Sequence, residues 1–388
     1  MIPFNRPFLT GKELEYIRCA HADGQLAGNG GFTHKCQNWL EEKTGCHKAH
    51  LTHSCTAALE MTAILAGIGP GDEIIMPSFT FVSTANAFVL RGGIPVFIDI
   101  RPDTLNLDEA KIEAAITDRT RAVVAVHYAG VSCAMDSIME IARRHGLLVI
   151  EDAAQGLMST YNGRPLGSIG HMATISFHET KNVISGEGGA LLINDPDFAA
   201  RAEIIREKGT DRSRFFRGEV DKYTWVDIGS SFMPGEVIAA FLWAQLEEAE
   251  RLTAERQARW RHYHALLKPL EMDGLISRQV VPAECGHNAH MYYVLLAPEF
   301  DRQAALAEFK KNGILAVFHY VPLHTSPAGQ RYGRSDGTLG TTDALSARLI
   351  RLPLWVGLEE RHQRYVVEVL TEALGAQRRS SAAPKPVS

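Results

Sequence analysis

The sequence lacks the features that mark secreted, membrane-spanning and nucleic-acid-binding proteins. Its six cysteines are scattered without a close pair, which argues against a disulfide framework and a cysteine-ligated zinc site. No apolar run is long enough to cross a membrane, and the first ten residues contain no basic stretch followed by an apolar one. The formal net charge of -5 gives no basic surface for nucleic acid. We therefore expect a cytoplasmic protein with reduced thiols and with neither a membrane nor a nucleic acid as its partner.

The length and composition fit a globular enzyme with more than one domain. The chain has 388 residues, of which 45% are hydrophobic and 22% charged. Such a chain buries a sizeable core and exceeds the usual size of one small domain. Its sixteen histidines form no HExxH motif, so we predict no metal site.

Short apolar segments alternate with helical patterns over the first half of the chain. Strands are predicted at residues 49–52, 73–76, 95–99, 122–126, 147–150, 172–177 and 190–193. A βαβα rhythm with strands that are apolar throughout is typical of a mainly parallel sheet covered by helices on both faces. We therefore predict an α/β fold with a seven-stranded sheet, and ligands on such sheets bind beyond the carboxyl ends of the strands.

A smaller α+β domain is expected in the C-terminal part. It contains a helical stretch at residues 236–267, strands at 291–296 and 316–320, and helices at 302–312, 342–350 and 359–374. We assign residues 1–240 to the large domain and residues 241–376 to a linker helix and the small domain. The tail at residues 377–388 is rich in Ser, Ala, Pro and basic residues and is predicted to be disordered.

One lysine lies in a glycine-dense connection between two predicted strands. Lys181 is flanked by the apolar run that ends at Phe177 and by the glycines from Gly186 to Gly189. A lysine at the end of a buried strand has a lowered pKa and can act as a nucleophile or a general base. A solvated lysine on a hairpin loop explains the same pattern, because charged residues are mostly exposed.

Three further strand ends carry residues with suitable chemistry. Asp152 follows the strand 147–150, where a carboxylate would hold a ring nitrogen protonated, as pyridoxal phosphate requires, or would cap the next helix. Thr56 begins a helix and would bind a phosphate with the free amides there, or would be an ordinary helix cap. Phe81 would cover a planar cofactor or belong to the core. With Lys181, these residues meet at equivalent ends of one sheet and favour bound pyridoxal phosphate.

Six motifs in sequence order resemble the DegT/StrS family of pyridoxal-phosphate-dependent nucleotide-sugar aminotransferases. They are Ser54-Cys55-Thr56-Ala57-Ala58-Leu59, Gly69-Pro70-Gly71-Asp72-Glu73, Pro77-Ser78-Phe79-Thr80-Phe81, Glu151-Asp152-Ala153-Ala154-Gln155, Ser176-Phe177-His178-Glu179-Thr180-Lys181-Asn182 and Gly186-Glu187-Gly188-Gly189. The resemblance extends over residues 1–375. It implies a fold-type I enzyme that binds pyridoxal 5'-phosphate and forms a homodimer with its active sites at the subunit interface.

The resemblance also implies roles for three residues in the chemistry. Lys181 would bind the cofactor covalently and then move the proton between the cofactor and the substrate carbon. Asp152 would pair with the pyridine nitrogen, and Gln155 would hydrogen-bond the phenolic oxygen.

Further residues would anchor the cofactor, as the resemblance implies. Thr56, Ala57 and Ser176 would hold the phosphate, and Phe81 would stack on the ring. Many family members carry an asparagine that reaches the phosphate of the neighbouring subunit. That asparagine is absent from this chain, and Ser231 is its predicted substitute.

A basic loop is the candidate site for the diphosphate of a substrate. Its residues are Arg212, Arg214, Arg217, Lys222 and Tyr223. One guanidinium group can bind two phosphate oxygens through paired hydrogen bonds, which favours a phosphate-binding role for this loop. The nearby Asp211, Glu219 and Asp221 offer another explanation, because they would neutralise the loop on a solvated surface. His178 and His319 are further candidates for substrate contact, and packing explains them equally well.

Segments 126–130 and 215–225 most resemble family members that aminate dTDP-4-dehydro-6-deoxy-D-glucose. The resemblance therefore implies that L-glutamate donates its amino group to the C4 ketone of this sugar. The products would be dTDP-4-amino-4,6-dideoxy-D-galactose, for lipopolysaccharide or enterobacterial common antigen, and 2-oxoglutarate. Another nucleotide-linked 4-keto or 3-keto sugar is an alternative, and so is a cofactor-binding regulator without turnover. Sugar dehydratases of the family carry a histidine in place of Lys181.

Overall fold

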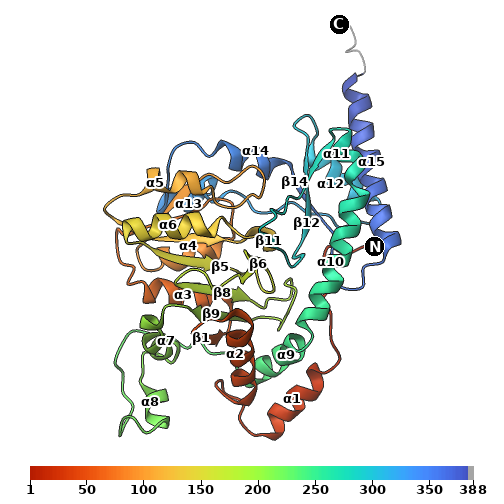
Figure 1. The fold of residues 1–388 in the computed structure, drawn as a ribbon. Helices are drawn as coiled ribbons and strands as arrows, with labels where there is room; N and C mark the ends of the chain where they lie inside the picture. The colour runs from red at the N-terminus through yellow and green to blue at the C-terminus, as the bar shows by residue number, and fades with distance from the viewer. Residues whose placement is uncertain (383–388) are drawn as a thin grey trace.

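A large sheet forms the centre of the computed structural model, which describes residues 1–382 (Figure 1). Its strands are β1 (Lys48–Thr52), β2 (Glu73–Pro77), β3 (Ile94–Ile98), β4 (Thr120–Val126), β5 (Leu148–Asp152), β8 (Met172–Ser176), β9 (Gly189–Ile193) and β13 (Arg334–Ser335). Their order across the sheet is β1-β9-β8-β5-β4-β2-β3-β13. Only β9 runs against its neighbours. The predicted mainly parallel α/β sheet is confirmed, but it has eight strands rather than seven.

Helices cover both faces of this sheet because the strand residues alternate in direction. One face packs against α3 (Cys55–Leu65), α4 (Val82–Val89) and α7 (Ala199–Arg206). The other face packs against α5 (Ile112–Ala115) and α6 (Met135–His145). Along β2, Ile74 and Met76 join the first core and Ile75 joins the second. This period of two buries both faces of the strand.

Three helices, two of them N-terminal, close the sheet on the side of β1. They are α1 (Glu13–Ala22), α2 (Gly31–Thr44) and α9 (Glu236–Leu246). The buried carboxylate of Glu236 accepts hydrogen bonds from the amides of Gly30 (2.9 Å) and Phe32 (2.8 Å). A carboxylate at a helix N-terminus is stabilised by the free amides there, so Glu236 joins the starts of α2 and α9.

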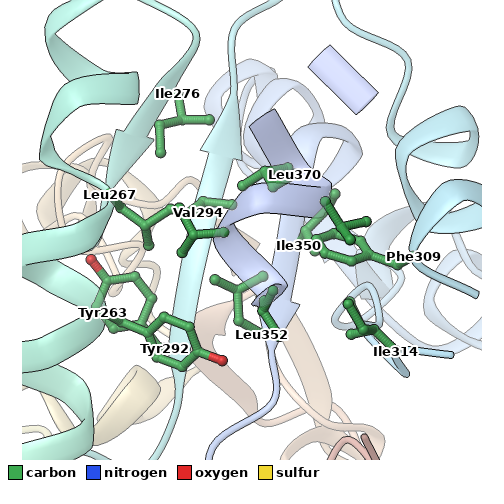
Figure 2. Packing of buried hydrophobic residues seen from close by; sticks show 14 of the residues in the cluster. Tyr263, Leu267, Ile276, Tyr292, Val294, Phe309, Ile314, Ile350, Leu352 and Leu370 are labelled. Carbon is green, nitrogen blue, oxygen red and sulfur yellow. The ribbon is translucent and has the colours of Figure 1, made fainter. Parts of the chain in front are cut away.

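The small domain has its own sheet and core. It contains α10 (Ala249–Leu266), α11 (Lys268–Met272), α12 (Arg302–Lys311) and α15 (Glu360–Ala382) around the strands β10 (Ile276–Arg278), β12 (Tyr292–Leu296) and β14 (Leu349–Leu352). Figure 2 shows Tyr263 of α10 beside Tyr292 of β12, with Leu352 of β14 close by. All three side chains are almost fully buried.

The segment before β14 returns to the large sheet. It contains η4 (Leu323–Thr325), α13 (Pro327–Tyr332), β13 and α14 (Gly340–Arg348). The guanidinium of Arg334 lies 2.8 Å from the carboxylate of Glu73 at the start of β2, which adds β13 to the sheet edge. This strand of two residues is too short to show in the sequence. The predicted domain boundary at residue 240 stays a prediction.

Short elements complete the part of the chain that the structure describes. They are η1 (Glu109–Lys111), η2 (Tyr128–Gly130), η3 (Pro196–Phe198), α8 (Arg212–Phe216), and the small sheet of β6 (Thr160–Tyr161), β7 (Arg164–Pro165) and β11 (Cys285–Gly286). Within residues 1–382, no helix is long and apolar enough to cross a membrane. The same residues contain no group of three or more His, Cys, Asp or Glu side chains that could hold a metal ion.

Three predictions about secondary structure are wrong. The stretch 236–267 forms two helices, α9 and α10. Residues 316–320 form one isolated bridge, Val317 with Arg351, because the chain turns at Tyr320, whose φ is 35°. Residues 377–382 continue α15 instead of being disordered, and the Gln377 side chain accepts a hydrogen bond from the Asp301 amide (2.8 Å). The rest of the predicted disordered tail, residues 383–388, lies outside the described residues.

Candidate active site

A cavity of about 750 Å³ opens beyond the carboxyl ends of β5 and β8. One wall comes from the large sheet and the helices α3 and α4, and the other from the small domain and the N-terminal segment. This is the place where ligands bind on parallel sheets. Four predicted residues from separate strand ends line it: Thr56, Phe81, Asp152 and Lys181.

Asp152 is the last residue of β5 and is fixed from two sides. Its Oδ2 accepts a hydrogen bond from the Thr84 hydroxyl (2.7 Å), and its Oδ1 accepts one from the Ala154 amide (3.2 Å). Thr84 in turn lies 2.8 Å from the hydroxyl of Thr80. The carboxylate is 5% exposed, so it faces the cavity without being solvated. This arrangement suits a carboxylate that pairs with a protonated ring nitrogen.

The neighbouring Glu151 points to the opposite face of β5. Its carboxylate lies 2.9 Å from the His127 imidazole and accepts hydrogen bonds from the amides of Ile169 and Gly170, both at 2.6 Å. Burial raises the pKa of Glu151, but these hydrogen bonds outweigh it and leave the pKa lowered. The two adjacent carboxylates therefore divide their roles, since Glu151 holds a loop and Asp152 faces the cavity.

Lys181 lies in a tight extension of the β8–β9 hairpin. The Lys181 amide donates to the carbonyl of His178 (2.8 Å), and the Glu179 amide donates to the carbonyl of Gly186 (2.9 Å). Gly186 has a φ of 81°, which a glycine adopts without strain. Burial lowers the pKa of Lys181. The amine is therefore more easily deprotonated than that of a solvated lysine, as the sequence predicted.

The start of α3 supplies hydroxyl and amide groups. The Ser54 side chain caps the helix by accepting the Ala57 amide (3.1 Å), and the hydroxyls of Thr56 and Ser83 lie 2.7 Å apart. Ser54, Cys55, Thr56, Ser83 and Ser176 line the cavity. A helix N-terminus with such hydroxyls binds phosphate well. Ser54 is thus the cap, and Thr56 remains available to a ligand.

Gly189 lets β9 approach the start of α3. A Cβ atom at this position would lie 2.4 Å from the Cys55 amide nitrogen and 2.5 Å from the Ser54 carbonyl carbon. Both neighbours are backbone atoms, so a side chain at position 189 would displace the start of the helix. The glycine in this position therefore keeps the α3 N-terminus close to the lysine loop.

Phe81 is 56% exposed, whereas Phe79 two residues earlier is buried in the core. An aromatic residue with an open face beside a cavity is suited to cover a planar ligand. Gln155 also lines the cavity, with its Oε1 held by the Ala129 amide (2.7 Å) and its Nε2 donating to the Tyr320 hydroxyl (2.9 Å). Its amide orientation is therefore fixed.

The small-domain wall contains residues that sequence reasoning did not single out as site residues. They are Arg256, His290, Tyr320 and Arg351. His319, which was predicted as a substrate contact, lies on this wall and stacks on Tyr320 with ring centroids 3.6 Å apart. Its Nδ1 lies 2.8 Å from the Tyr128 hydroxyl. Burial lowers the pKa of His319 well below its usual value, so the ring is neutral near pH 7.

His178 lines the cavity, but the basic loop does not. The His178 ring lies 2.9 Å from the Thr180 hydroxyl. In the basic loop, Arg217 pairs with Glu203 (2.5 Å) and Glu219 (2.7 Å), and Arg214 pairs with Glu219 (3.2 Å). Within one chain the acidic neighbours therefore neutralise these two arginines.

The remaining predicted residues also lie away from the cavity. Arg212 stacks on Phe216 at 5.1 Å, and Lys222 and Tyr223 are exposed. Ser231 is exposed and pairs with Glu207 in an isolated bridge. None of these residues lines the cavity of its own chain, so their roles stay predictions.

The cavity residues that were not predicted from the sequence differ in how strong a signal they leave in it. Arg351 interrupts the apolar strand Leu349–Leu352, and an arginine in such a strand is a usable signal. Thr84 follows Phe81 by one helical turn, which places both on the side of α4 that faces the cavity. Arg256 and His290 carry no local signal because they reach the cavity only through the packing of the small domain.

Comparison with known proteins identifies the family. The family model described as DegT/DnrJ/EryC1/StrS aminotransferase family matches residues 8–371. The chain belongs to this family. The match confirms the predicted family, the fold-type I architecture, the aminotransferase activity and the pyridoxal phosphate cofactor.

Individual relatives of this aminotransferase differ in their assigned functions. A pleiotropic regulatory protein of Geobacillus stearothermophilus is 35% identical over 319 residues, 81% of this chain and 82% of the relative. GDP-perosamine synthase of Caulobacter vibrioides is 34% identical over 372 residues, 95% of this chain and 97% of the relative. The crystal structure of the aminotransferase TlmJ from Streptoalloteichus hindustanus has a TM-score of 0.88 at 28% identity and covers 97% of this chain and 99% of that chain.

Proposed function

We propose that this aminotransferase transfers the amino group of L-glutamate to the C4 ketone of dTDP-4-dehydro-6-deoxy-D-glucose. The products are dTDP-4-amino-4,6-dideoxy-D-galactose and 2-oxoglutarate. The observation that carries the transaminase chemistry is the meeting of Lys181, Asp152 and Thr56 on one cavity. The resemblance of segments 126–130 and 215–225 to enzymes that aminate this sugar supports the choice of substrate.

The residues around the cavity fit pyridoxal phosphate. Thr56 and the free amides at the start of α3 would hold its phosphate, and Asp152 would keep its ring nitrogen protonated. Phe81, with its open face, would cover the ring. When bound, the cofactor withdraws electrons from the substrate carbon that loses its proton. Thr84 and the Ala154 amide hold the Asp152 carboxylate in place for this task.

Lys181 acts as the general base and acid in both halves of the reaction. Its amine takes the proton from the α-carbon of glutamate and later delivers a proton to C4 of the sugar. Burial lowers the lysine pKa, which brings the amine closer to the range where it both accepts and releases a proton. The hairpin extension that contains Lys181 also carries His178 and Thr180 along the cavity, so the amine stands beside the space for the substrate.

The basic loop is proposed to bind the substrate diphosphate in the cavity of a partner subunit. This proposal includes a homodimer, and it explains how residues far from the cavity of their own chain could serve a site. Mixing inactive Lys181→Ala protein with Arg217→Gln protein tests it. Recovery of activity in the mixture supports a shared site, because one mixed-dimer cavity then holds an intact lysine and an intact loop. A mixture that is no more active than its components contradicts it.

Initial rates with two different sugar nucleotides and the same amino donor, L-glutamate, test the choice of sugar nucleotide. The relative named GDP-perosamine synthase makes a GDP-linked 4-keto sugar the second candidate. We expect kcat/KM for dTDP-4-dehydro-6-deoxyglucose to exceed that for a GDP-linked 4-keto-6-deoxy sugar. A higher value for the GDP sugar would overturn the proposed nucleotide while leaving the aminotransferase chemistry intact.

A regulator without turnover is the other candidate, because one relative is named a pleiotropic regulatory protein. The intact set of Lys181, Asp152 and Gln155 favours an enzyme, since a binding role alone needs no proton-transfer residue. Adding glutamate to the holoenzyme and measuring released 2-oxoglutarate separates the two candidates. One equivalent of 2-oxoglutarate per active site supports the enzyme, and none supports the regulator.

A further inference from the structure

Two arginines, the buried Arg256 and the partly buried Arg351, line the small-domain wall of the cavity without a carboxylate partner. Arg256 of α10 and Arg351 of β14 both reach the lining. Arg256 is 4% exposed and donates to the backbone carbonyls of Ala289 (3.1 Å) and His290 (2.6 Å). Among residues 1–382, neither arginine lies within ion-pair distance of an Asp or Glu. Cations that are largely removed from water are normally paired, so this wall lacks a negative partner.

Arg351 is the arginine that is held ready for a ligand. It alternates with Ile350 and Leu352, which point into the small-domain core, as the labels in Figure 2 show. Its guanidinium lies 4.6 Å from the centre of the Phe4 ring. Within residues 1–382, its one hydrogen-bond acceptor is the carbonyl of Phe318, which lies 3.3 and 3.4 Å from two guanidinium nitrogens. An aromatic face orients a guanidinium while leaving its edge free to donate.

The other charges of the cavity do not supply the missing partner. Its only two carboxylates are Asp152 and Glu187. Thr84 and Ala154 hold Asp152, which serves the cofactor nitrogen in the proposed function. Glu187 has a side chain that is 71% exposed and lies 3.7 Å from the His178 ring. Neither carboxylate of the cavity lining is therefore the partner of Arg351.

We propose that Arg351 binds a carboxylate of the amino donor. This inference rests on the proposed function, because it assigns the donor half of that same site. The donor is an amino acid with two carboxylates, and a guanidinium binds a carboxylate through two parallel hydrogen bonds. The sugar substrate has hydroxyl groups instead, which accept single hydrogen bonds from the same edge. One arginine can therefore hold the donor firmly and still admit the sugar.

Burial and electrostatics are consistent with this role. Burial lowers the pKa of Arg351, and His290 and His319 beside it have pKa values well below their usual range. The two histidines are neutral near pH 7, so they add no positive charge that would compete with Arg351 for the carboxylate of the donor. Phe4 comes from the N-terminal segment, which reaches the cavity because Ile2 pairs with Ile314 of the small domain.

Separate half-reactions of Arg351→Gln test the proposal. In one, holoenzyme reacts with glutamate alone; in the other, the aminated enzyme reacts with the ketosugar alone. We expect the second-order rate constant for glutamate to fall about 10- to 100-fold, the value of a charged hydrogen bond. The rate constant for the sugar should change less than about threefold. Inhibition by glutarate, a dicarboxylate without an amine, should weaken about as much as the glutamate reaction.

Two variants complete the test. Arg348→Gln is the matched control, because Arg348 donates only to the carbonyls of Leu296 (3.0 Å) and Ala344 (3.1 Å) and does not line the cavity. It should leave both half-reactions unchanged. Arg351→Lys keeps the charge without the paired donors and should restore part of the glutamate rate.

Three results would overturn the role of Arg351. They are an unchanged glutamate rate in Arg351→Gln, an equal loss in both half-reactions, and a loss confined to the sugar half-reaction. The last would assign the guanidinium to the diphosphate. Wild-type protein that does not react with glutamate would instead overturn the proposed function, so the two failures are distinguishable.

Discussion

The two walls of the cavity are built in different ways. On the large-sheet wall, each chemical residue follows a strand end and is held by near neighbours, as Asp152 is held by Thr84 and Ala154. On the small-domain wall, Arg256, His290 and Arg351 come from segments that only the tertiary fold brings together. The first wall holds the groups for the chemical step, and the second has free donors that suit a substrate.

This difference between the two walls separates the residues for the chemical step from the residues for substrate recognition. A reaction shared by a whole family needs the same groups at the same strand ends, whereas different substrates need different walls opposite them. Changes to the large-sheet wall should therefore lower kcat, and changes to the small-domain wall should mainly alter KM for one substrate. The predictions below test this division in order of expected effect.

Lys181→Ala should have the largest effect. Without its amine, the proton transfers in both half-reactions lose their base and acid, so kcat should fall at least about 10³-fold. Cofactor binding should persist through the phosphate site around Thr56. Borohydride reduction followed by peptide mass spectrometry should find the cofactor attached to residue 181 in wild type only. Lys311→Ala, at an exposed position on α12, is the control. Normal turnover by Lys181→Ala would remove the lysine from the chemistry.

Asp152→Asn should lower kcat by about 10² to 10³-fold while KM for glutamate changes little. An amide cannot keep the ring nitrogen protonated, but it has the same shape. Its oxygen can still accept the hydrogen bond from the Ala154 amide, and its NH2 group can donate to the Thr84 hydroxyl. Steady-state kinetics with circular dichroism of the folded protein checks this outcome. Asp195→Asn is the matched control, since Asp195 only caps η3. A change in KM alone would place Asp152 among the recognition residues.

Glu73→Gln should affect stability and leave both walls intact. Glu73 binds Arg334 and Arg119, and its pKa is lowered to about 2, mainly by the hydrogen bond from Arg334. A lowered folded-state pKa contributes stability above the unfolded value of 4.5 that is lost as the pH falls toward 2. Urea denaturation near pH 7 should show a loss of about 2 kcal/mol.

The pH dependence of the free energy of unfolding provides a control for the Glu73→Gln prediction. In wild type, part of the free energy of unfolding should disappear between pH 4.5 and pH 2, and Glu73→Gln should lack that part. Glu308→Gln, which breaks an exposed pair with Lys311, should not reproduce the effect. If wild type and Glu73→Gln lose the same free energy of unfolding between pH 4.5 and pH 2, Glu73 is not the source of the pH dependence.

Arg217→Gln should have the smallest effect on the folded chain. The Arg217 side chain is 48% exposed, and exposed ion pairs contribute little because water screens them. The midpoint of thermal unfolding should shift by less than about 2 °C, measured by differential scanning fluorimetry. A larger shift would show that the basic loop stabilises its own chain, which would weaken its proposed role at a partner's cavity.

The sequence predicts the large-sheet wall well, because strand ends and helix starts are local features. Lys181, Asp152, Thr56 and Phe81 could be located from the apolar strands that precede them and from the family motifs. The edge strand β13 could not, since two residues held by Glu73 leave no periodic pattern.

Density of charge in the sequence does not show which cations are free of acidic partners in the folded chain. The cations of the basic loop are close together in the sequence, yet Glu203 and Glu219 neutralise Arg217 in the folded chain. Arg351 stands alone in an apolar strand, and its place on the cavity wall without a carboxylate partner is what makes it suited to an anion. Only the tertiary structure shows which arginine has a partner.

The most direct measurement of the central claim is the product formed from dTDP-4-dehydro-6-deoxyglucose and L-glutamate with isotopically labelled nitrogen. Mass spectrometry and NMR of the sugar nucleotide would follow the reaction. We predict a dTDP-linked amino sugar with the label on C4 in the galacto configuration, together with an equal amount of 2-oxoglutarate. Recovery of the unchanged ketosugar, or a deoxygenated sugar without the label, would contradict it.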